Sequence, residues 1–351
     1  MIEIVNNLLA LSKLEPGWNQ LGARFDSPML QFDWFYSCAE NLHKESELHV
    51  IVYRSDNEIK AIAPLVTRKN SISTWLELLG SSALYEPSGL LFDSPQSLDN
   101  LLVAMVEQGY PINLSRVSKD SPILNASQSL SKTSTICLTR PSAGSFFITT
   151  DDDWDTFYSK IGKKWRSDFR NKHSRAASQG TVGVEIYCPS VDQFSDTMNK
   201  VMDIEQLSWK GRQGTCLHNT PHLKNFFLNY ARRCMAQGIL RTCFYNISDE
   251  SIAMNLGVEF GNRLWFFKTG YNEEWSRVSP GMQLNMASIK YTFDKRLAGY
   301  EFLGSEESWQ NAWPVKSHDY CSVILLPFST KGILGLGDIV LKFAKNRLSK
   351  S

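Results

Sequence analysis

The second half of the chain contains the turn Arg277-Val278-Ser279-Pro280-Gly281-Met282-Gln283-Leu284, which joins a predicted strand, residues 264–271, to a predicted helix, residues 279–297. Serine is a favoured helix N-cap, and proline suits the first helical position. Such a helix start directs free backbone N–H groups and the positive end of the helix dipole outward. We therefore expect this turn to bind a pyrophosphate, with Gly281 allowing the phosphate to come close. The alternative is a plain capped helix without a ligand.

The elements around this turn predict one domain built on an antiparallel meander. Its strands are expected at residues 239–245, 252–260, 264–271, 300–304 and 320–326. Apolar residues from Trp154 to Ala176 recur every three or four positions, which predicts one long helix that ends near Gly180. Two further helices, residues 191–209 and 221–237, flank a turn that contains Gly211 and Gly214.

The first half of the chain predicts a helix followed by strands, which favours an α+β fold over repeated βαβ units. The helix starts near Ser27-Pro28, and the strands are expected at residues 48–53, 59–65 and 75–80. We therefore expect an α+β protein of two domains, each a mixed, largely antiparallel twisted sheet flanked by helices. The expected domains are residues 1–145 and 146–331. A glycine-rich loop, residues 332–338, is expected to lead into a basic tail helix within residues 332–351.

The composition excludes several classes of protein. The 351 residues carry 37 Lys and Arg against 36 Asp and Glu, so no overall field attracts nucleic acid, and we expect no nucleic-acid partner. Seven cysteines, an odd number without any C-x-x-C pair, favour free thiols in a reducing compartment. We see no secretion signal and no apolar run long enough for a transmembrane segment. We therefore expect a cytoplasmic protein.

Two local patterns invite a binding interpretation. The segment from Lys160 to Arg175 is strongly basic, and Asp168 is its one acidic residue. Its charges either lie on a solvated helix face or contact CoA phosphates or an acidic acyl carrier protein. The spacing Cys216-x-His218-x-x-x-His222 is similar to that of zinc ligands. Pro221 interrupts that segment and no fourth ligand is near, so we expect no metal site.

Four motifs of the second half resemble the GNAT superfamily of acyl-CoA N-acyltransferases. The closer resemblance is to its CelD-like branch, the acetyltransferases of the cellulose-biosynthesis type, which is similar to the Fem peptidyltransferases. The motifs are the basic helix at residues 161–170, Glu205-x-x-Ser208-Trp209-Lys210-Gly211-Arg212-x-Gly214-Thr215, Phe267-Lys268-Thr269-Gly270-Tyr271-Asn272-Glu273 with Ser279-Pro280-Gly281, and Glu301-Phe302-Leu303-Gly304-Ser305-Glu306 with Trp309 and Trp313. The sequence departs from the family where Glu301 replaces the usual Asp and where Trp309-Gln310 replaces the usual Tyr-Lys.

The resemblance covers residues 150–315 strongly and the first half weakly, and it implies a GNAT-like fold in both domains. It implies an N-acyltransferase that has no tightly bound cofactor and uses acyl-CoA, or an acyl carrier protein thioester, as co-substrate. The implied donor-site residues are Arg277, Val278, Ser279, Gly281, Met282, Gln283 and Leu284. Trp209, Lys210 and Trp309 are implied to contact the acceptor, the amine of an amino sugar or of a peptide.

Direct attack of an amine on a thioester requires two positioned substrates, a proton acceptor and a stabilised oxyanion. We consider Glu301, Glu306 and Glu205 as the general base, and each of them has a structural ion pair or cap as its alternative role. Tyr271 is a candidate to protonate the leaving thiolate, and Lys268 either polarises a carbonyl or pairs with a carboxylate. Regular strand alternation places Lys268 and Tyr271 on opposite faces, so both face one site only if the strand bulges between them.

Two other functions remain open at this stage. A Fem-like aminoacyl transferase would use charged tRNA as donor, although the sequence shows no long charged heptad pair for a helical arm. A non-catalytic GNAT-like protein would only bind a ligand or a partner, and Gln310 in place of the family's lysine is consistent with it.

Overall fold

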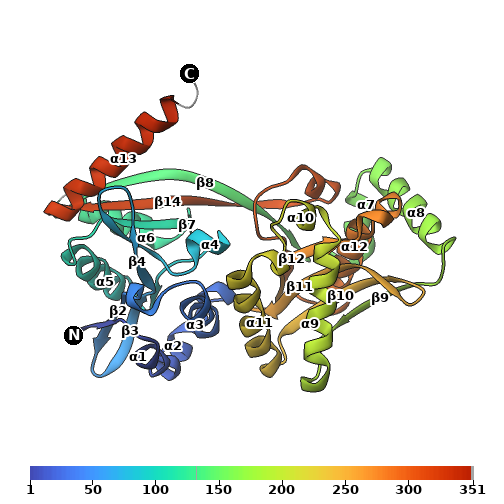
Figure 1. Cartoon of the computed structure of the whole chain (residues 1–351), viewed down its shortest axis with the longest axis horizontal. Helices are drawn as coiled ribbons and strands as arrows, with labels where there is room; N and C mark the ends of the chain where they lie inside the picture. Colours follow the sequence, from blue (N-terminus) through green and yellow to red (C-terminus); the bar gives the residue numbers. More distant parts are fainter. Residues whose placement is uncertain (132, 349–351) are drawn as a thin grey trace. The chain divides into compact units, whose positions relative to one another are not determined.

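The computed structural model describes residues 1–131 and 133–348, so the end of the expected tail, residues 349–351, lies outside the described part. The chain forms two compact units, which we describe separately (Figure 1). Unit 1 comprises Met1–Ala143 and Asp319–Ser351, and unit 2 comprises Gly144–His318. The chain enters unit 2 within β8 (Thr135–Thr149) and returns within β14 (Lys316–Pro327).

Unit 1 contains two groups of strands around one core. The first group, in the order β1-β2-β3-β6, is antiparallel and comprises Ile2–Val5, Val50–Ser55, Glu58–Ala63 and Leu91–Phe92. The second, in the order β4-β5-β7-β14, comprises Leu65–Lys69, Thr74–Leu78, Ile112–Ser118 and β14, and its β5–β7 pair is parallel. The helices are α1 (Leu8–Ser12), α2 (Glu15–Gly22), α3 (Phe32–Asn41), α4 (Ser81–Leu84), α5 (Pro95–Glu107) and α6 (Pro122–Leu130). The core collects apolar residues of α5 and the strands.

Unit 2 contains a sheet in the order β8-β13-β12-β11-β10-β9, in which β12 and β13 run parallel and the other neighbours run antiparallel. Its further strands are β9 (Val182–Tyr187), β10 (Leu240–Ile247), β11 (Glu250–Phe260), β12 (Arg263–Tyr271) and β13 (Gly299–Glu301). Its helices are α7 (Trp154–Lys160), α8 (Lys163–Ala177), α9 (Val191–Gln206), α10 (Trp209–Arg212), α11 (Pro221–Ala236) and α12 (Pro280–Asp294). The expected mixed, largely antiparallel sheets flanked by helices are confirmed.

Side chains of the unit 2 sheet alternate between two apolar layers, as strand geometry requires. On one face Tyr245 and Phe266 pack with Phe169 of α8 and Leu284 of α12. On the other face Phe267 packs edge-on against Tyr230 of α11 at 5.6 Å between ring centres. Helices therefore cover both faces of this sheet (Figure 1).

A bulge in β12 changes which residues share a face. Gly257 of β11 pairs with Phe266, whereas Leu256 pairs with Lys268, so Phe267 is the extra residue. A Cβ atom on Gly257 would lie 2.0 Å from the carbonyl oxygen of Trp265, which explains why glycine is needed there. The bulge precedes Lys268, and the register is regular from there to Tyr271. Lys268 and Tyr271 therefore remain on opposite faces.

Three predicted elements differ in the structure. The long helix expected from Trp154 to Ala176 is broken into α7 and α8 at Ile161-Gly162, where both residues adopt extended backbone angles and Ile161 is buried. The strand expected at residues 300–304 ends at Glu301, because Leu303 and Gly304 have positive φ angles of 54° and 58°. Residues 319–331, which we expected in the second domain, group with unit 1.

The expected glycine-rich loop at residues 332–338 is helical and belongs to α13 (Thr330–Leu348). Asp338 holds this helix to unit 1, because its carboxylate accepts hydrogen bonds from Ser73 Oγ, Trp75 Nε1 at 3.1 Å and the Ile72 N–H at 2.9 Å. Burial raises the pKa of Asp338, but these hydrogen bonds outweigh burial and keep the pKa below its usual value. In the described part of the chain, no helix is long and apolar enough to cross a membrane.

We predict that Asp338→Ala lowers the free energy of unfolding by about 1–3 kcal/mol, because it leaves buried donors without an acceptor. The stabilisation by Asp338 is complete above the pKa of the unfolded chain and is lost as the pH falls through the lower pKa of the folded protein. Urea unfolding between neutral and acidic pH measures both effects, with the exposed Lys342→Ala as control. Equal stability of Asp338→Ala and wild type would contradict this anchor.

Candidate functional site

The start of α12 leaves backbone donors free. Ser279 is the N-cap residue in the left-handed region, with a φ angle of 50°, but its side chain makes no cap hydrogen bond, which corrects the expected serine cap. The first helical bond runs from the Gln283 N–H to the Ser279 carbonyl oxygen at 3.1 Å. Pro280 has no N–H, so in the described structure the N–H groups of Gly281 and Met282 have no helical acceptor. Both residues are half-buried and can meet a ligand.

The other residues expected at the donor turn have different surroundings. Val278 and Leu284 are buried in the core, so their side chains pack rather than face a ligand. Gln283 Nε2 donates to the Phe169 carbonyl oxygen of α8 at 3.0 Å. The Arg277 carbonyl oxygen accepts a hydrogen bond from Arg175 of α8 at 3.1 Å. The basic helix α8 is thus attached directly to this turn.

Tyr271 closes the turn on the side of the sheet. A Cβ atom on Gly281 would lie 3.3 Å from Cδ1 of Tyr271, so the tyrosine ring packs directly against the first turn of α12. A larger residue at position 281 therefore meets this ring first.

β12 has an open edge beside the turn. β13 pairs with β12 only from Arg263 to Trp265, and the chain then leaves the sheet. Among the described residues, no strand pairs with residues 266–271 on that side. An exposed strand edge offers backbone N–H and C=O groups to an extended ligand. The open edge ends at the free N–H groups of α12.

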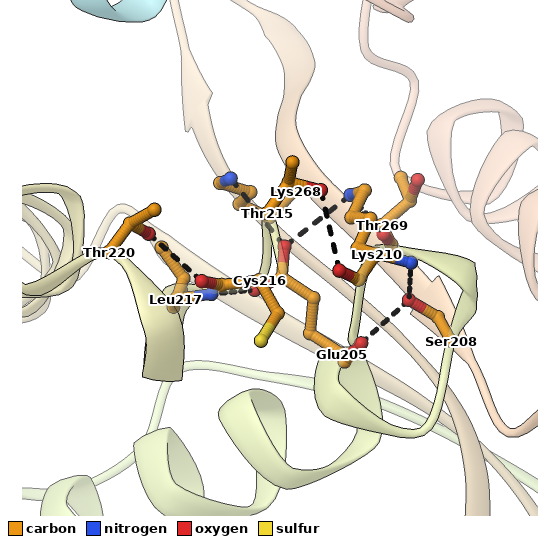
Figure 2. Close-up of polar contacts among 9 residues, drawn as sticks. All are labelled: Glu205, Ser208, Lys210, Thr215, Cys216, Leu217, Thr220, Lys268 and Thr269. Atoms are coloured by element: carbon orange, nitrogen blue, oxygen red, sulfur yellow. Dashed lines mark hydrogen bonds and ion pairs between the residues drawn. The ribbon is translucent and has the colours of Figure 1, made fainter. Parts of the chain in front are cut away.

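Glu205, at the end of α9, is fully buried and belongs to a network on the other face of β12 (Figure 2). Its Oε1 lies 3.4 Å from Nζ of Lys210 and 3.5 Å from Nζ of Lys268. Its Oε2 accepts a hydrogen bond from the Leu217 N–H at 2.8 Å. Lys210 Nζ also donates to the Thr269 carbonyl oxygen at 2.8 Å. One carboxylate therefore joins α9, α10 and β12.

The local backbone explains the Trp209-Lys210-Gly211 motif. Ser208 caps α10, since its Oγ accepts from the Lys210 N–H at 3.2 Å, and the same Oγ donates to the Glu205 carbonyl oxygen at 2.6 Å. A Cβ atom on Gly211 would lie 1.8 Å from the Gln206 carbonyl oxygen, so only glycine fits this turn. Burial lowers the pKa of Lys210, and the nearby Glu205 carboxylate opposes that effect. The indole of Trp209 is exposed beside this network.

Glu301 lies in a second cluster. It is buried, its Oε1 accepts from Arg263 Nε at 2.7 Å, and its Oε2 lies 3.1 Å from Nε2 of His318. The ring of His318 stacks on Phe147 at 4.0 Å between ring centres. Glu301 pairs with Trp265, six residues before Tyr271 along β12. Six residues of strand span roughly 20 Å, so Glu301 and Tyr271 cannot both contact one reacting carbonyl.

The remaining expected residues lie beyond β13. Glu306 is exposed and accepts a hydrogen bond from Ser317 Oγ. Trp309 packs on Phe302 and donates through Nε1 to Glu307 at 2.6 Å. Gln310 is buried, and its Oε1 accepts from the Glu307 N–H at 2.6 Å. Gln310 therefore serves as a structural cap.

The Cys216 segment does not form a metal centre. Cys216 is buried before the short 3-10 helix Leu217–Asn219, and His218 lies 3.2 Å from Asp203. Within residues 1–131 and 133–348, no group of three or more His, Cys, Asp or Glu side chains is placed to hold a metal ion.

Three partners of the carboxylates carry no recognisable signal in the sequence. Arg263 and His318 contact Glu301, and the Leu217 N–H contacts Glu205. Arg263 is the first residue of β12, and Glu301 is the last residue of its parallel neighbour β13. Correct pairing of these two strands would therefore have predicted the contact between Arg263 and Glu301. His318 lies 17 residues from Glu301, and no periodic pattern connects the two.

Residues 163–311 match the family model described as acetyltransferase (GNAT) domain. The matched range includes the turn at residues 277–284 and all three candidate carboxylates, Glu205, Glu301 and Glu306. No curated protein matches the chain.

The fold of the whole chain is similar to that of solved structures at low sequence identity. One is FemX, with 10% identity and a TM-score of 0.62 over 92% of this chain and 97% of that chain. Another is the C-terminal domain of a putative lysylphosphatidylglycerol synthetase from Agrobacterium fabrum, with 11% identity and a TM-score of 0.58 over 94% and 97%. A protein of unknown function from Bacteroides thetaiotaomicron has 7% identity and a TM-score of 0.58 over 93% and 99%.

We predict that Glu205→Gln lowers the free energy of unfolding by about 3–5 kcal/mol, because two ammonium groups lose their buried counter-charge. Lys268→Met leaves the Glu205–Lys210 pair intact and should cost much less. Urea unfolding of both variants and of the double variant, which should recover part of the loss, measures this coupling. Wild-type stability of Glu205→Gln with lost turnover would instead identify Glu205 as the base.

Proposed function

We propose that the chain is an N-acyltransferase that moves an acyl group from an acyl-CoA thioester to a primary amine by direct attack. One observation carries this proposal: the open edge of β12, residues 266–271, ends at the free N–H groups of Gly281 and Met282. An extended thioester donor with a pyrophosphate at one end is complementary to that arrangement. The same residues lie within the matched GNAT acetyltransferase domain.

The charge beside the donor turn supports a polyanionic donor. α8 contributes the exposed cations Lys163, Lys164 and Arg170, and its Arg175 is bonded to the turn itself. The same cations would suit the acidic surface of an acyl carrier protein, the alternative thioester carrier. The acceptor that we propose, an amino sugar or a peptide amine, follows from resemblance to the CelD-like branch. The cytoplasmic location that we propose rests on the seven cysteines without a C-x-x-C pair.

The length of β12 separates the two ends of the donor. With the pyrophosphate at α12, an arm extended along β12 carries its thioester toward Trp265 and Glu301. We therefore propose Glu301 as the base, acting with His318. Glu301 is buried, whereas the ring of His318 is partly exposed. The amine nitrogen bonds to the thioester carbon, its proton passes to this pair, and the C–S bond breaks to release the thiolate. Tyr271 then contacts the pyrophosphate end rather than the leaving thiolate.

The Glu205 network has a positioning role in this proposal. The Glu205 carboxylate is buried against two lysines, Lys210 and Lys268, and the Leu217 N–H. Unlike Glu301, it has no partly exposed imidazole among these partners to take a proton from an incoming amine. It fixes α10, and so presents the exposed Trp209 to the acceptor. Trp309, on the other side of Glu301 in the sequence, is proposed as a second acceptor contact.

A different donor, charged tRNA, is the second candidate, because the fold resembles that of FemX over almost the whole chain. The two donors are separated by direct assay with acyl-CoA alone. Binding of CoA without turnover on any amine would instead support a non-catalytic binding protein.

We predict that Met282→Pro weakens CoA binding at least tenfold, because proline removes one N–H from the first turn of α12, where the helix tolerates it. Met282→Ala keeps the N–H and is the matched control for loss of the side chain. Gly281→Val should also weaken CoA binding, but through displacement of Tyr271. Calorimetry measures the CoA affinity of all three variants. Equal affinity of Met282→Pro and Met282→Ala would show that the Met282 N–H does not bind CoA.

We predict that Glu301→Gln lowers turnover by about 10²–10⁴ and leaves CoA affinity unchanged, as expected for loss of a general base. Glu301→Asp, with the residue that the family usually has, should restore much of the rate. The exposed Glu306→Gln is the control and should stay within about twofold of wild type, since its only effect is on Ser317. A larger loss in Glu306→Gln than in Glu301→Gln would show that Glu306 is the base.

A further inference from the structure

α13 turns Gly335, Gly337 and Ile339 toward unit 1, whereas five other large apolar residues among its described side chains face solvent. A Cβ atom on Gly335 would lie 2.6 Å from Cβ of Pro111, and one on Gly337 would lie 2.7 Å from Cδ1 of Ile72. The exposed apolar residues of this helix are Ile333 at 70%, Leu334 at 46%, Leu336 at 43%, Val340 at 59% and Leu341 at 40%. Helices of globular proteins have the opposite arrangement, with the apolar stripe against the core.

The apolar surface continues beyond the helix. Phe328, at the end of β14, is 66% exposed, and Ile136 of β8 is 41% exposed. With Ile333 and Leu336 they line one hollow beside the start of α13. A continuous exposed apolar patch of this kind marks a surface that binds a partner or a membrane.

Cations accompany this patch. The cationic residues of α13 are Lys331, Lys342, Lys345 and Arg347. Its one acidic residue, Asp338, points inward and accepts a hydrogen bond from Trp75 of β5. Lys342, Lys345 and Arg347 are exposed, and in the described part of the chain no carboxylate pairs with them. The solvent-facing surface of this helix is therefore apolar and positively charged.

We propose that α13 binds the surface of an anionic phospholipid bilayer, with its apolar residues at the acyl boundary and its cations at the lipid phosphates. A second copy of the chain fits less well. Arg347 follows Leu336 and Val340 at eleven and seven residues, so helical spacing places it on the apolar face. A second α13 would bury this guanidinium without a carboxylate, whereas a bilayer places it among phosphates.

The test is sedimentation of the full chain with vesicles, either of phosphatidylcholine alone or of equal parts phosphatidylcholine and phosphatidylglycerol. We expect strong binding to the mixed vesicles and weak binding to the neutral ones. Replacing Lys342, Lys345 and Arg347 together with glutamine should weaken binding to mixed vesicles about 100-fold, at about 1 kcal/mol per cation. Ile333→Ser with Val340→Ser should weaken it similarly, whereas Leu9→Ser, at an equally exposed position of α1, should not.

Several results would overturn this proposal. One is failure of the wild-type chain to bind mixed vesicles at low salt. A second is binding of the Ile333→Ser/Val340→Ser variant to mixed vesicles as strongly as wild type. A third is a wild-type dimer in the absence of lipid that becomes monomeric in the same variant. Thermal unfolding confirms that each variant is folded, since all the replaced side chains are exposed. Vesicle binding does not depend on CoA, so its failure leaves the proposed acyl transfer untouched.

Discussion

The parting of β12 from β13 after Trp265 is the constraint on which the candidate site depends. Three residue pairs hold the two parallel strands together, and the positive φ angles of Leu303 and Gly304 then turn the chain away. Had β13 continued alongside β12, its backbone would occupy the edge that residues 266–271 now leave open. The same parting brings Glu301 to the inner end of that edge, while α12 starts at the outer end.

The Glu205 network supports β12 from the opposite face. A buried carboxylate shared by two lysines is costly to desolvate, and it persists because both of its oxygens have donors or cations as partners. Through Lys210 and the Thr269 carbonyl oxygen it bonds to the backbone of β12 just after the bulge at Phe267. The edge that would receive a ligand is thereby held in one conformation before any ligand arrives.

Motifs and periodicity predicted much of unit 2 correctly. The α+β class, the meander of β10 to β12 and the helix that starts at Pro280 all follow from alternating apolar residues and a proline at the first helical turn. The break between α7 and α8 was not predicted, because the helical spacing of apolar residues continues across Ile161-Gly162. The helical state of residues 332–338 was not predicted because Gly335 faces Pro111 and Gly337 faces Ile72, and no local pattern encodes these tertiary contacts.

The site residues divide in the same way. Spacing along the chain identified the three glutamates but not their partners, because Arg263 and His318 approach Glu301 from different strands. Glu301 of β13 pairs with Trp265, whereas Tyr271 lies at the far end of β12. This separation follows from strand pairing, which the sequence alone does not reveal.

Amide hydrogen exchange with and without CoA tests the central claim most directly, because the claim concerns backbone N–H groups. The account predicts that CoA slows exchange at Gly281 and Met282 and along residues 266–271, and leaves the buried turn at Leu217 unchanged. Slowed exchange elsewhere in the chain, with no change along β12 and at the start of α12, would contradict it.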